Sequence, residues 1–332
     1  MGSYLLKRVA LMAVTIWGAL TIMFVLLVAM PGDAVEAKQG EKAVAAGIQQ
    51  NIRRKYGLDD PVPVQYVKYW KNLASGELGY SVQNDKSVNE MLGETAKTSL
   101  RLAFWGGLVQ LLGSLGLGFL SAARRNSVID KVSTVLSVTA QAIPVFVTGL
   151  LLQVVFGVIP SNAGGFLNKH LNFVGFWPSE WRFGVIPKEN WKVVILPAVA
   201  VGIVQMAYLA RLLRSSMLEV MRADYLRTAR AKGLSMRRVL VKHALRNALI
   251  PWVTAASLAV VETFGIAVQT ETTFGLFGVG SQVAESALIQ DTNPILGLTS
   301  IVVLATAVTL LFVDLLYSVL DPRIRVGSKL AD

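Results

Sequence analysis

The chain has 332 residues, of which 53% are hydrophobic and only 16% are charged, and its mean hydropathy is +0.52. A soluble domain carries about 25% charged residues, so this composition indicates a protein whose main solvent is lipid. The lack of cysteine excludes disulfides and thiolate chemistry, and two histidines are too few to favour a histidine-built site. We therefore expect neither catalytic nor metal-binding residues.

Six apolar segments are long enough to cross a bilayer, which takes about 20 residues of helix. In chain order they are Val9–Met30, Leu102–Ala123, Val132–Ile159, Val193–Ala210, Ala248–Thr270 and Ile295–Val313. The first segment is long and no small-residue cleavage site follows it, so we expect a retained span rather than a signal peptide. Six spans place both termini on the same side of the membrane.

The placement of Lys and Arg predicts the orientation. The net charge of +11 is concentrated at the edges of the apolar segments, which favours membrane topology over nucleic-acid binding as its cause. Residues 211–247 carry ten basic and two acidic residues, whereas residues 271–294 carry no Lys or Arg. Because Lys and Arg accumulate in cytoplasmic loops, we expect both termini and the even-numbered links to be cytoplasmic.

Several residues inside the spans are candidates for a role beyond packing. Pro144 is expected to kink the third span, and with Gln141 it lines a substrate path or simply packs. Glu262 is the only charge in the fifth span, so it either faces the path or forms a structural pair. Asp314, near the end of the sixth span, is expected to form a structural ion pair or cap close to Arg323.

The second span is rich in small residues at helical spacing, which let two helix backbones approach closely. They are Ala103, Gly107, Ser114, Gly118 and Ala122. Two alternatives follow: this face packs against other helices of the same chain, or it packs against another membrane subunit.

The basic link after the fourth span contains a short predicted helix. Asp224 is a favoured N-cap, the helix runs from Tyr225 to Lys232, and Gly233 ends it. A helix of two turns is unstable alone in water, so it must dock on its own bundle or on a partner. Ala229 and Ala231 have small side chains, so the helix is narrow at these positions, which suits insertion into a groove.

A second helix is predicted to follow the first, with Ser235 as its cap. On it Arg238, Lys242 and Arg246 recur every four residues and form one basic stripe. This stripe lies at the lipid headgroups or contacts a partner.

The stretch from Asp224 to Ser235, with Lys242 to Pro251 after it, resembles the EAA-type coupling loop of ABC importer permeases. The similarity is greatest to the B-type permease of the dipeptide/oligopeptide family, and weaker matches cover nearly the whole chain. They are Leu6–Arg8, Pro31–Asp33, Tyr56–Pro61, Gly76–Ser81, Ile143–Phe146, Tyr208–Arg211 and Asp321–Arg325. The turn at Leu276–Gly280 departs from the family's usual Trp-Pro-Gly-Leu-Gly, and Glu262 is not part of the family pattern.

The resemblance implies an all-α polytopic membrane protein with six transmembrane helices of the type I ABC importer (MetI-like) permease fold, and an extracytoplasmic insertion between helices 1 and 2. The expected parts are residues 1–30 with the first helix, the extracytoplasmic segment 31–98, the permease core 99–320 with its coupling loop at about 215–247, and the cytoplasmic tail 321–332.

The resemblance also implies a role in peptide import at a bacterial or archaeal plasma (inner) membrane. This chain and a second homologous permease subunit would form the path, two cytoplasmic ATPase subunits would hold ATP and Mg, and an extracytoplasmic binding protein would deliver the substrate. The chain has no G-x-x-x-x-G-K-[ST] loop and is expected to bind no cofactor itself. The residues assigned to coupling are Asp224, Tyr225, Arg227, Thr228, Ala229, Ala231, Lys232 and Gly233.

Three alternatives remain open. The same architecture could import nickel chelates, opines or glycans. An ion-coupled secondary transporter would need its own ion site or paired broken helices. In the segment outside the membrane, Tyr66, Tyr69 and Trp70 form either a docking surface for the binding protein or a small lid over the bundle.

Overall fold

A computed structural model describes residues 2–29, 60–163, 172–175 and 177–320. The chain forms two compact units. The terminal unit combines Met1–Thr98 with Phe277–Asp332, and the central unit is Ser99–Leu276. Within these described residues, six helices are long and apolar enough to span a membrane, in agreement with the predicted number. Their spanning parts are Leu6–Val28, Val88–Ala123, Val145–Ala163, Lys192–Val220, Met236–Phe274 and Thr292–Leu315.

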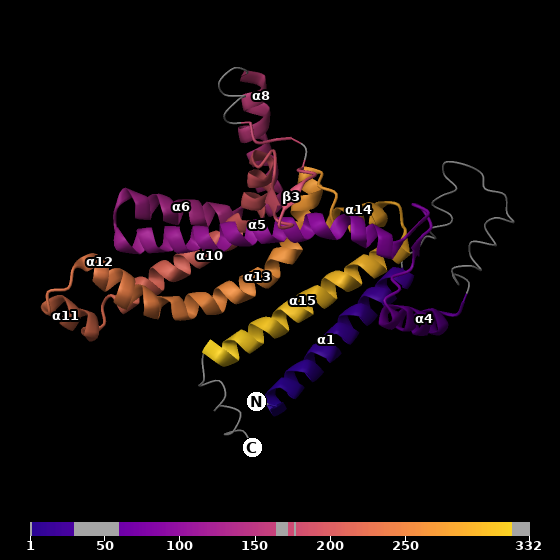
Figure 1. Ribbon diagram of the computed structural model, residues 1–332, viewed down its shortest axis with the longest axis horizontal. Coiled ribbons are helices and arrows are strands. Elements are labelled where there is room, and N and C mark those ends of the chain that lie inside the picture. Colours follow the sequence, from indigo (N-terminus) through magenta and orange to yellow (C-terminus); the bar gives the residue numbers. More distant parts are fainter. Residues whose placement is uncertain (1, 30–59, 164–171, 176, 321–332) are drawn as a thin grey trace. The chain divides into compact units, whose positions relative to one another are not determined.

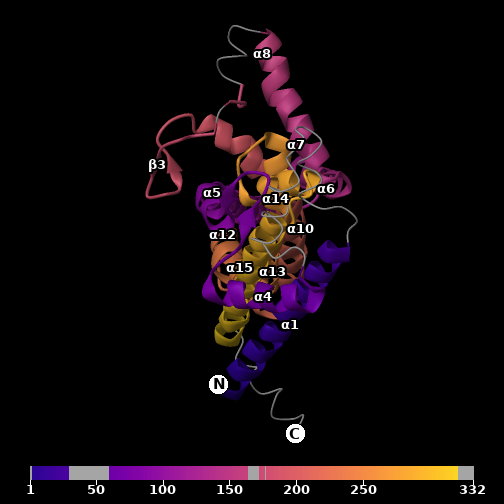
Figure 2. The ribbon, with the colours of Figure 1, turned by 90° about the vertical axis from the view of Figure 1, so that its right-hand side faces the viewer.

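The terminal unit is built on two long helices, α1 and α15, which pack side by side (Figures 1 and 2). Its elements are α1 (Gly2–Ala29), α4 (Val62–Ser75), β1 (Tyr80–Ser81), β2 (Lys86–Ser87), the first part of α5 (Val88–Ala123), α14 (Val279–Leu288) and α15 (Thr292–Leu320). Arg8 of α1 forms an ion pair of 2.9 Å with Asp314 of α15. The expected ion pair of Asp314 therefore has its partner in the other long helix, while Arg323 lies outside the described residues.

The aromatic side chains of α4 face the two long helices. The Tyr66 hydroxyl is 2.7 Å from that of Thr21 in α1, and the Tyr69 hydroxyl is 2.8 Å from that of Ser300 in α15. The ring of Phe24 lies 5.3 Å from Tyr66 and 5.6 Å from Tyr69. Burial raises the pKa of the Tyr69 phenol. These contacts favour the lid over the docking surface, because the aromatic groups are used within the unit.

A short antiparallel hairpin, β1 with β2, is fastened to the start of α15. Tyr80 pairs with Ser87 in its register. The Asp291 carboxylate accepts hydrogen bonds from the Ser81 hydroxyl (2.6 Å) and from the backbone N–H of Gln83 (3.1 Å). Gly297 allows close contact here, since a Cβ at this position would lie 2.5 Å from the carbonyl oxygen of Leu78.

The central unit contains the other helices that the structure describes. Its elements are the rest of α5, α6 (Val128–Ala142), α7 (Val145–Gln153), the π-helix η1 (Val154–Val158), α8 (Ile159–Ala163), β3 (Trp181–Arg182), β4 (Ile186–Pro187), α10 (Lys192–Val220), α11 (Asp224–Ala231), α12 (Met236–Arg238), the π-helix η2 (Val239–Leu245) and α13 (Arg246–Phe274). Helix α10 contacts α6, α7 and α13, so it is the centre of this unit.

Small residues let α5 approach α10 closely. A Cβ on Gly202 would lie 2.6 Å from the carbonyl oxygen of Gly106, and a Cβ on Gly118 would lie 2.7 Å from that of Ala210. Ser114 and Ala122 are buried on the same side. These residues serve packing within the chain, whereas Gly107 has open space where a Cβ would sit.

The third span is interrupted rather than kinked, which corrects the prediction made for Pro144. Helix α6 ends at Ala142, Ile143 is extended (φ −93°, ψ 128°), and Pro144 (φ −56°, ψ 142°) precedes α7 as its N-cap. The proline ring disfavours helical geometry in the residue before it. The apolar run is therefore divided into two helices, of which only α7 and its continuation to Ala163 form the candidate span.

Candidate functional site: the loop between α10 and α13

Helix α11 starts one residue earlier than the sequence predicts. Ala223 is the N-cap, with extended geometry (φ −67°, ψ 142°), and its carbonyl accepts from the N–H of Leu226 at 3.0 Å. Asp224 is therefore the first helical residue rather than the cap. Its carboxylate still suits the positive end of the helix dipole, but its 3.8 Å contact with Arg227 is almost fully exposed and contributes little.

The C-terminal end of α11 is a Schellman motif, in which two backbone bonds close the last turn. The N–H of Gly233 donates to the carbonyl of Arg230 (2.9 Å), and that of Leu234 donates to the carbonyl of Ala229 (3.4 Å). Lys232 is the C-cap, and Gly233 follows it with φ +77°. The predicted stop at Gly233 is confirmed, and its cause is the left-handed backbone that glycine adopts without strain.

Helix α11 docks on its own unit through two residues. Leu226 is fully buried and Ala229 nearly so, in a cluster that includes Met217 of α10, Val239 of η2 and Ala248 of α13. Full burial of one leucine contributes roughly 1.5–3 kcal/mol. Ala229 thus faces the chain's own core, so α11 docks on its own bundle, one of the two alternatives left open; the assignment of Ala229 to coupling stays a prediction.

A hydrogen bond joins α11 to the beginning of α13. The Asn247 side-chain amide donates to the Tyr225 hydroxyl at 2.7 Å and to the carbonyl of His243 at 3.3 Å. Tyr225 is 45% exposed, so its ring lies at the edge of the docked helix. This contact limits how far α11 can tilt without moving α13.

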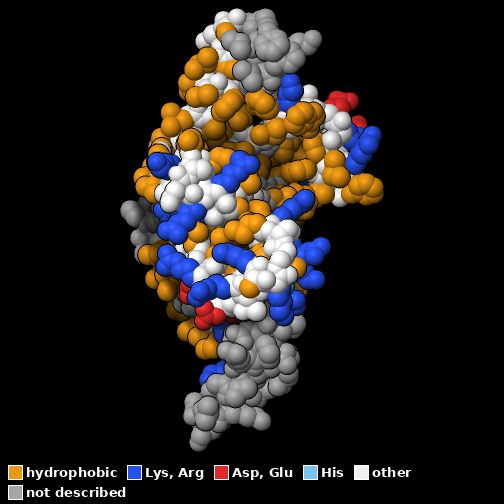
Figure 3. Space-filling model, turned by 90° about the vertical axis from the view of Figure 1, so that its left-hand side faces the viewer, with side chains coloured by type: hydrophobic (Ala, Val, Ile, Leu, Met, Phe, Trp, Pro, Cys, Tyr) orange, Lys and Arg blue, Asp and Glu red, His pale blue; other side chains and the backbone are white. Residues whose placement is uncertain are grey.

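The outward face of α11 is polar and mainly basic. The exposed residues from this helix to its cap are Asp224, Tyr225, Arg227, Thr228, Arg230, Ala231 and Lys232. Lys and Arg side chains gather on the face of the molecule that carries α11 and α12 (Figure 3). Seven of the eight residues predicted for coupling are therefore exposed or, like Gly233, lie at the exposed end of the helix, and Ala229 alone is buried.

The predicted second helix begins after Ser235, which is an N-cap by its backbone angles but makes no capping bond with its side chain. It continues through η2 into α13 without interruption. Arg238, Lys242 and Arg246 are all exposed, as a basic stripe requires.

The three residues proposed for a substrate path lie apart and have different surroundings. The Gln141 amide oxygen of α6 accepts from the Arg211 guanidinium of α10, and the Glu262 carboxylate of α13 accepts from the Gln205 amide of α10. Positions 205 and 211 are about 9 Å apart along the helix axis. Pro144 is exposed between α6 and α7 and takes part in neither contact.

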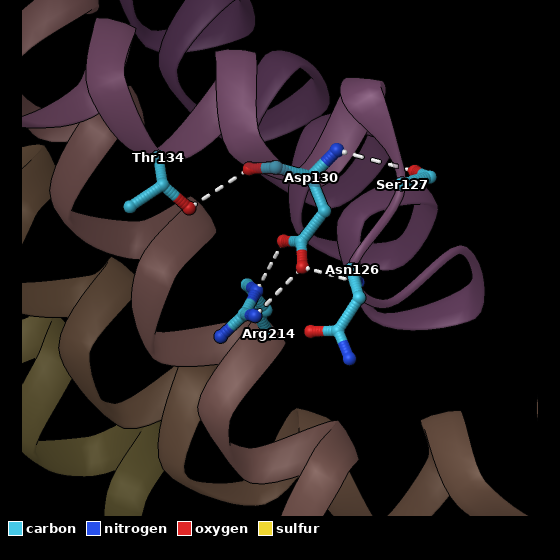
Figure 4. Close-up of polar contacts among 5 residues, drawn as sticks. All are labelled: Asn126, Ser127, Asp130, Thr134 and Arg214. Carbon is cyan, nitrogen blue, oxygen red and sulfur yellow. Dashed lines mark hydrogen bonds and ion pairs between the residues drawn. The ribbon is translucent and has the colours of Figure 1, made fainter.

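An ion pair that the sequence analysis missed joins α6 to α10 (Figure 4). The Arg214 guanidinium donates to both carboxylate oxygens of Asp130, at 2.8 Å to Oδ2, and the N–H of Asn126 donates to Oδ2 at 2.9 Å. The Asp130 side chain is 5% exposed. The hydrogen bond from Arg214 lowers the pKa of Asp130. Ser127, three residues before Asp130, has the spacing of a helix cap and was the one available signal.

Comparison with known proteins places this arrangement in a family. Residues 114–326 match the family described as "Binding-protein-dependent transport system inner membrane component", and residues 1–103 match the N-terminal part of such membrane components. The chain is similar to the dipeptide transport system permease protein DppB of Bacillus subtilis, with 34% identity over 99% of this chain and 100% of the relative.

Two further relatives support the same assignment. The oligopeptide transport system permease protein AppB of Bacillus subtilis is 36% identical over 98% of this chain and 99% of its own length. The oligopeptide transport system permease protein OppB of Escherichia coli is 33% identical over 98% of this chain and its entire length. A multi-pass membrane protein with these full-length similarities belongs to the family of inner-membrane components of binding-protein-dependent transport systems.

Proposed function

We propose that this chain is a non-catalytic permease subunit of an ATP-driven importer that carries di- or oligopeptides. The full-length similarity to dipeptide and oligopeptide permeases supports this substrate class. In the proposed assembly a second homologous permease completes the path, two ATPase subunits hold ATP and Mg, and a binding protein delivers the substrate. Both termini and α11 lie on the cytoplasmic side, as the excess of Lys and Arg in residues 211–247 indicates.

The observation that carries the proposal is the way α11 is built. One face, Leu226 and Ala229, is fixed to the core of the chain, while the opposite face is exposed and basic. A short helix with one anchored and one free face can transmit a displacement from a bound partner to the helices beneath it. ATP binding closes the ATPase pair and displaces α11, and α10 and α13 follow because α11 lies between them in the chain and shares one buried cluster with both.

The driving force follows from differential binding. Nucleotide shifts the bundle between inward-open and outward-open states only by the difference in its affinity for them. The chain itself supplies no nucleotide loop of the G-x-x-x-x-G-K-[ST] type. The nucleotide therefore binds to the partner subunits, and their movement is transmitted to the spans through α11.

Cysteine cross-linking tests the contact with the ATPase. The chain contains no cysteine, so Ala231→Cys introduces one thiol on the exposed face of α11. Ala229→Cys, on the buried face of the same helix, is the matched control. In the purified complex, with one cysteine in the ATPase subunit, we expect a cross-link from position 231 and none from position 229. If position 231 reacts only with lipid-soluble reagents and never with the ATPase, the proposed contact is wrong.

Uptake measurements separate the proposed function from its alternatives. In liposomes that contain the complex, uptake of a tripeptide should require internal ATP and persist when ion gradients are abolished. Uptake that follows an ion gradient instead would identify a secondary transporter. Uptake of a nickel chelate, an opine or a glycan with no peptide uptake would retain the architecture but replace the substrate.

A further inference from the structure

We propose that Glu262, held by Gln205, binds the protonated amino group of the peptide during its passage. The inference rests on the proposed function and names the chemical group that the path recognises. The carboxylate lies far from both ends of α13, about 24 Å along the axis from Arg246 and about 18 Å from Phe274. It is therefore near the middle of the helix that is expected to cross the membrane.

Glu262 lies beside the buried face of α13 and not on it. The neighbouring Thr263 is buried and its hydroxyl is 3.1 Å from the amide oxygen of Gln110 in α5, whereas Glu262 is exposed. A carboxylate at this depth is costly when it faces lipid. It must therefore face protein or a water-filled path in the assembled transporter.

The charge of Glu262 is not neutralised within the described part of the chain, where its one hydrogen-bond partner is the uncharged Gln205 amide. A carboxylate accepts about four hydrogen bonds, so most of its capacity is free. Because Gln205 donates through Nε2, its own Oε1 remains an acceptor beside the carboxylate. Two adjacent acceptors with one negative charge suit an ammonium group, which has three donors and one positive charge.

The exposed face of α13 continues from this carboxylate toward the end of the helix. Gly265 and Gln269 lie three and seven residues after Glu262, on the same face of the helix, and both are exposed. Apart from the nearby turns of α13 itself, nothing lies within 4 Å of where a Cβ of Gly265 would sit, so the helix surface one turn from Glu262 is open in this chain. On the other side of Glu262 the same face continues with Leu258, which is apolar and 49% exposed. Glu262 thus ends this part of the face with a charge, where an arriving cation would stop.

Transport of matched peptides tests this assignment. The complete complex, with its partner permease, ATPases and binding protein, is reconstituted in liposomes, and uptake of trialanine is compared with that of N-acetyl-trialanine, which lacks the ammonium group. The binding protein is the same for all variants, so its own selectivity cancels when variants are compared. We expect Glu262→Gln to lower the ratio of unmodified to acetylated uptake roughly tenfold, as for loss of one charged hydrogen bond.

Two further variants make the result specific. Glu262→Asp keeps the charge and should retain most of the preference. Glu285→Gln is the matched control, because Glu285 is also an exposed carboxylate contacted by a glutamine amide, that of Gln282 at 3.4 Å. It should leave the ratio unchanged.

Three outcomes would overturn the inference. If Glu262→Gln lowers uptake of both peptides by the same factor, or changes the uptake of neither, the carboxylate does not bind the ammonium group. If that variant loses the partner permease on purification, Glu262 pairs with a basic side chain of the partner. In that case Gln205→Ala, which keeps the charge, should still assemble and should leave the ratio unaltered. A wild-type complex that imports no peptide with ATP would instead refute the proposed function, and the inference with it.

Discussion

The substitution Gly233→Val tests whether the end of α11 matters for coupling. Gly233 has φ +77°, and nothing beyond its two chain neighbours lies within 4 Å of where its Cβ would be, so the cost of a side chain is conformational and not a clash. For an ordinary residue, left-handed geometry costs roughly 1–2 kcal/mol, and a branched Cβ places valine at the upper end. That energy lowers the population of correctly ended helix by a factor of roughly 5–30.

The assay compares ATP hydrolysis with uptake in reconstituted complexes. We expect the Gly233→Val variant to insert and assemble normally but to hydrolyse several times more ATP for each peptide imported. The reason is that a wrongly ended α11 no longer transmits the movement of the ATPase to α10 and α13. Gly233→Asn is the matched control, since asparagine adopts the left-handed conformation more readily than other residues with a side chain. Equal coupling in the valine and asparagine variants, or normal uptake by the valine variant, would refute the reasoning.

Two further predictions concern the packing of the central unit. Leu226→Ala removes the fully buried anchor of α11 at a cost of about 2–5 kcal/mol, so trypsin should cut the loop roughly thirtyfold faster or more, while Thr228→Ala on the exposed face should leave cleavage unchanged. Asp130→Asn should lower stability at pH 7 by about 2 kcal/mol, measured by thermal unfolding in detergent, and the exposed Asp224→Asn by less than about 0.5 kcal/mol. Because the bond from Arg214 lowers the pKa of Asp130, its contribution is complete above the ordinary value of about 3.9 and is lost as the pH falls through the lowered one. The difference between wild type and Asp130→Asn should therefore vanish in strong acid, and a difference that grows there would contradict the assignment.

Hydropathy predicted how many helices cross the membrane but not where the helices end. The second span was predicted to begin at Leu102, whereas α5 begins at Val88. The intervening turns carry Glu90, Glu94 and Lys97, which are good helix formers but interrupt an apolar run. The apolar pattern identifies only the part of a helix that can lie in lipid. The helix itself continues beyond that part, because its backbone hydrogen bonds do not depend on apolar side chains.

The division of the third span was predictable in kind, because proline restricts the residue before it. The hydrophobicity of Ile143 and Val145 concealed the break, since both belong to the same apolar run. Local rules served better in the loop after α10. The end of α11 at Gly233 depends on one residue's backbone freedom, and the structure confirms it.

Contacts between distant helices could not be predicted, since nothing in one sequence pairs Asp130 with Arg214, which lie 84 positions apart. Yet these contacts decide how a movement of α11 would spread. Three polar side chains of α10, namely Gln205, Arg211 and Arg214, bind α13 once and α6 twice. Only three residues separate the end of α10 from α11. A displacement of α11 therefore moves α10, which is hydrogen-bonded to both α6 and α13. The same movement shifts Gln205 and with it the Glu262 carboxylate, with no other helix in between.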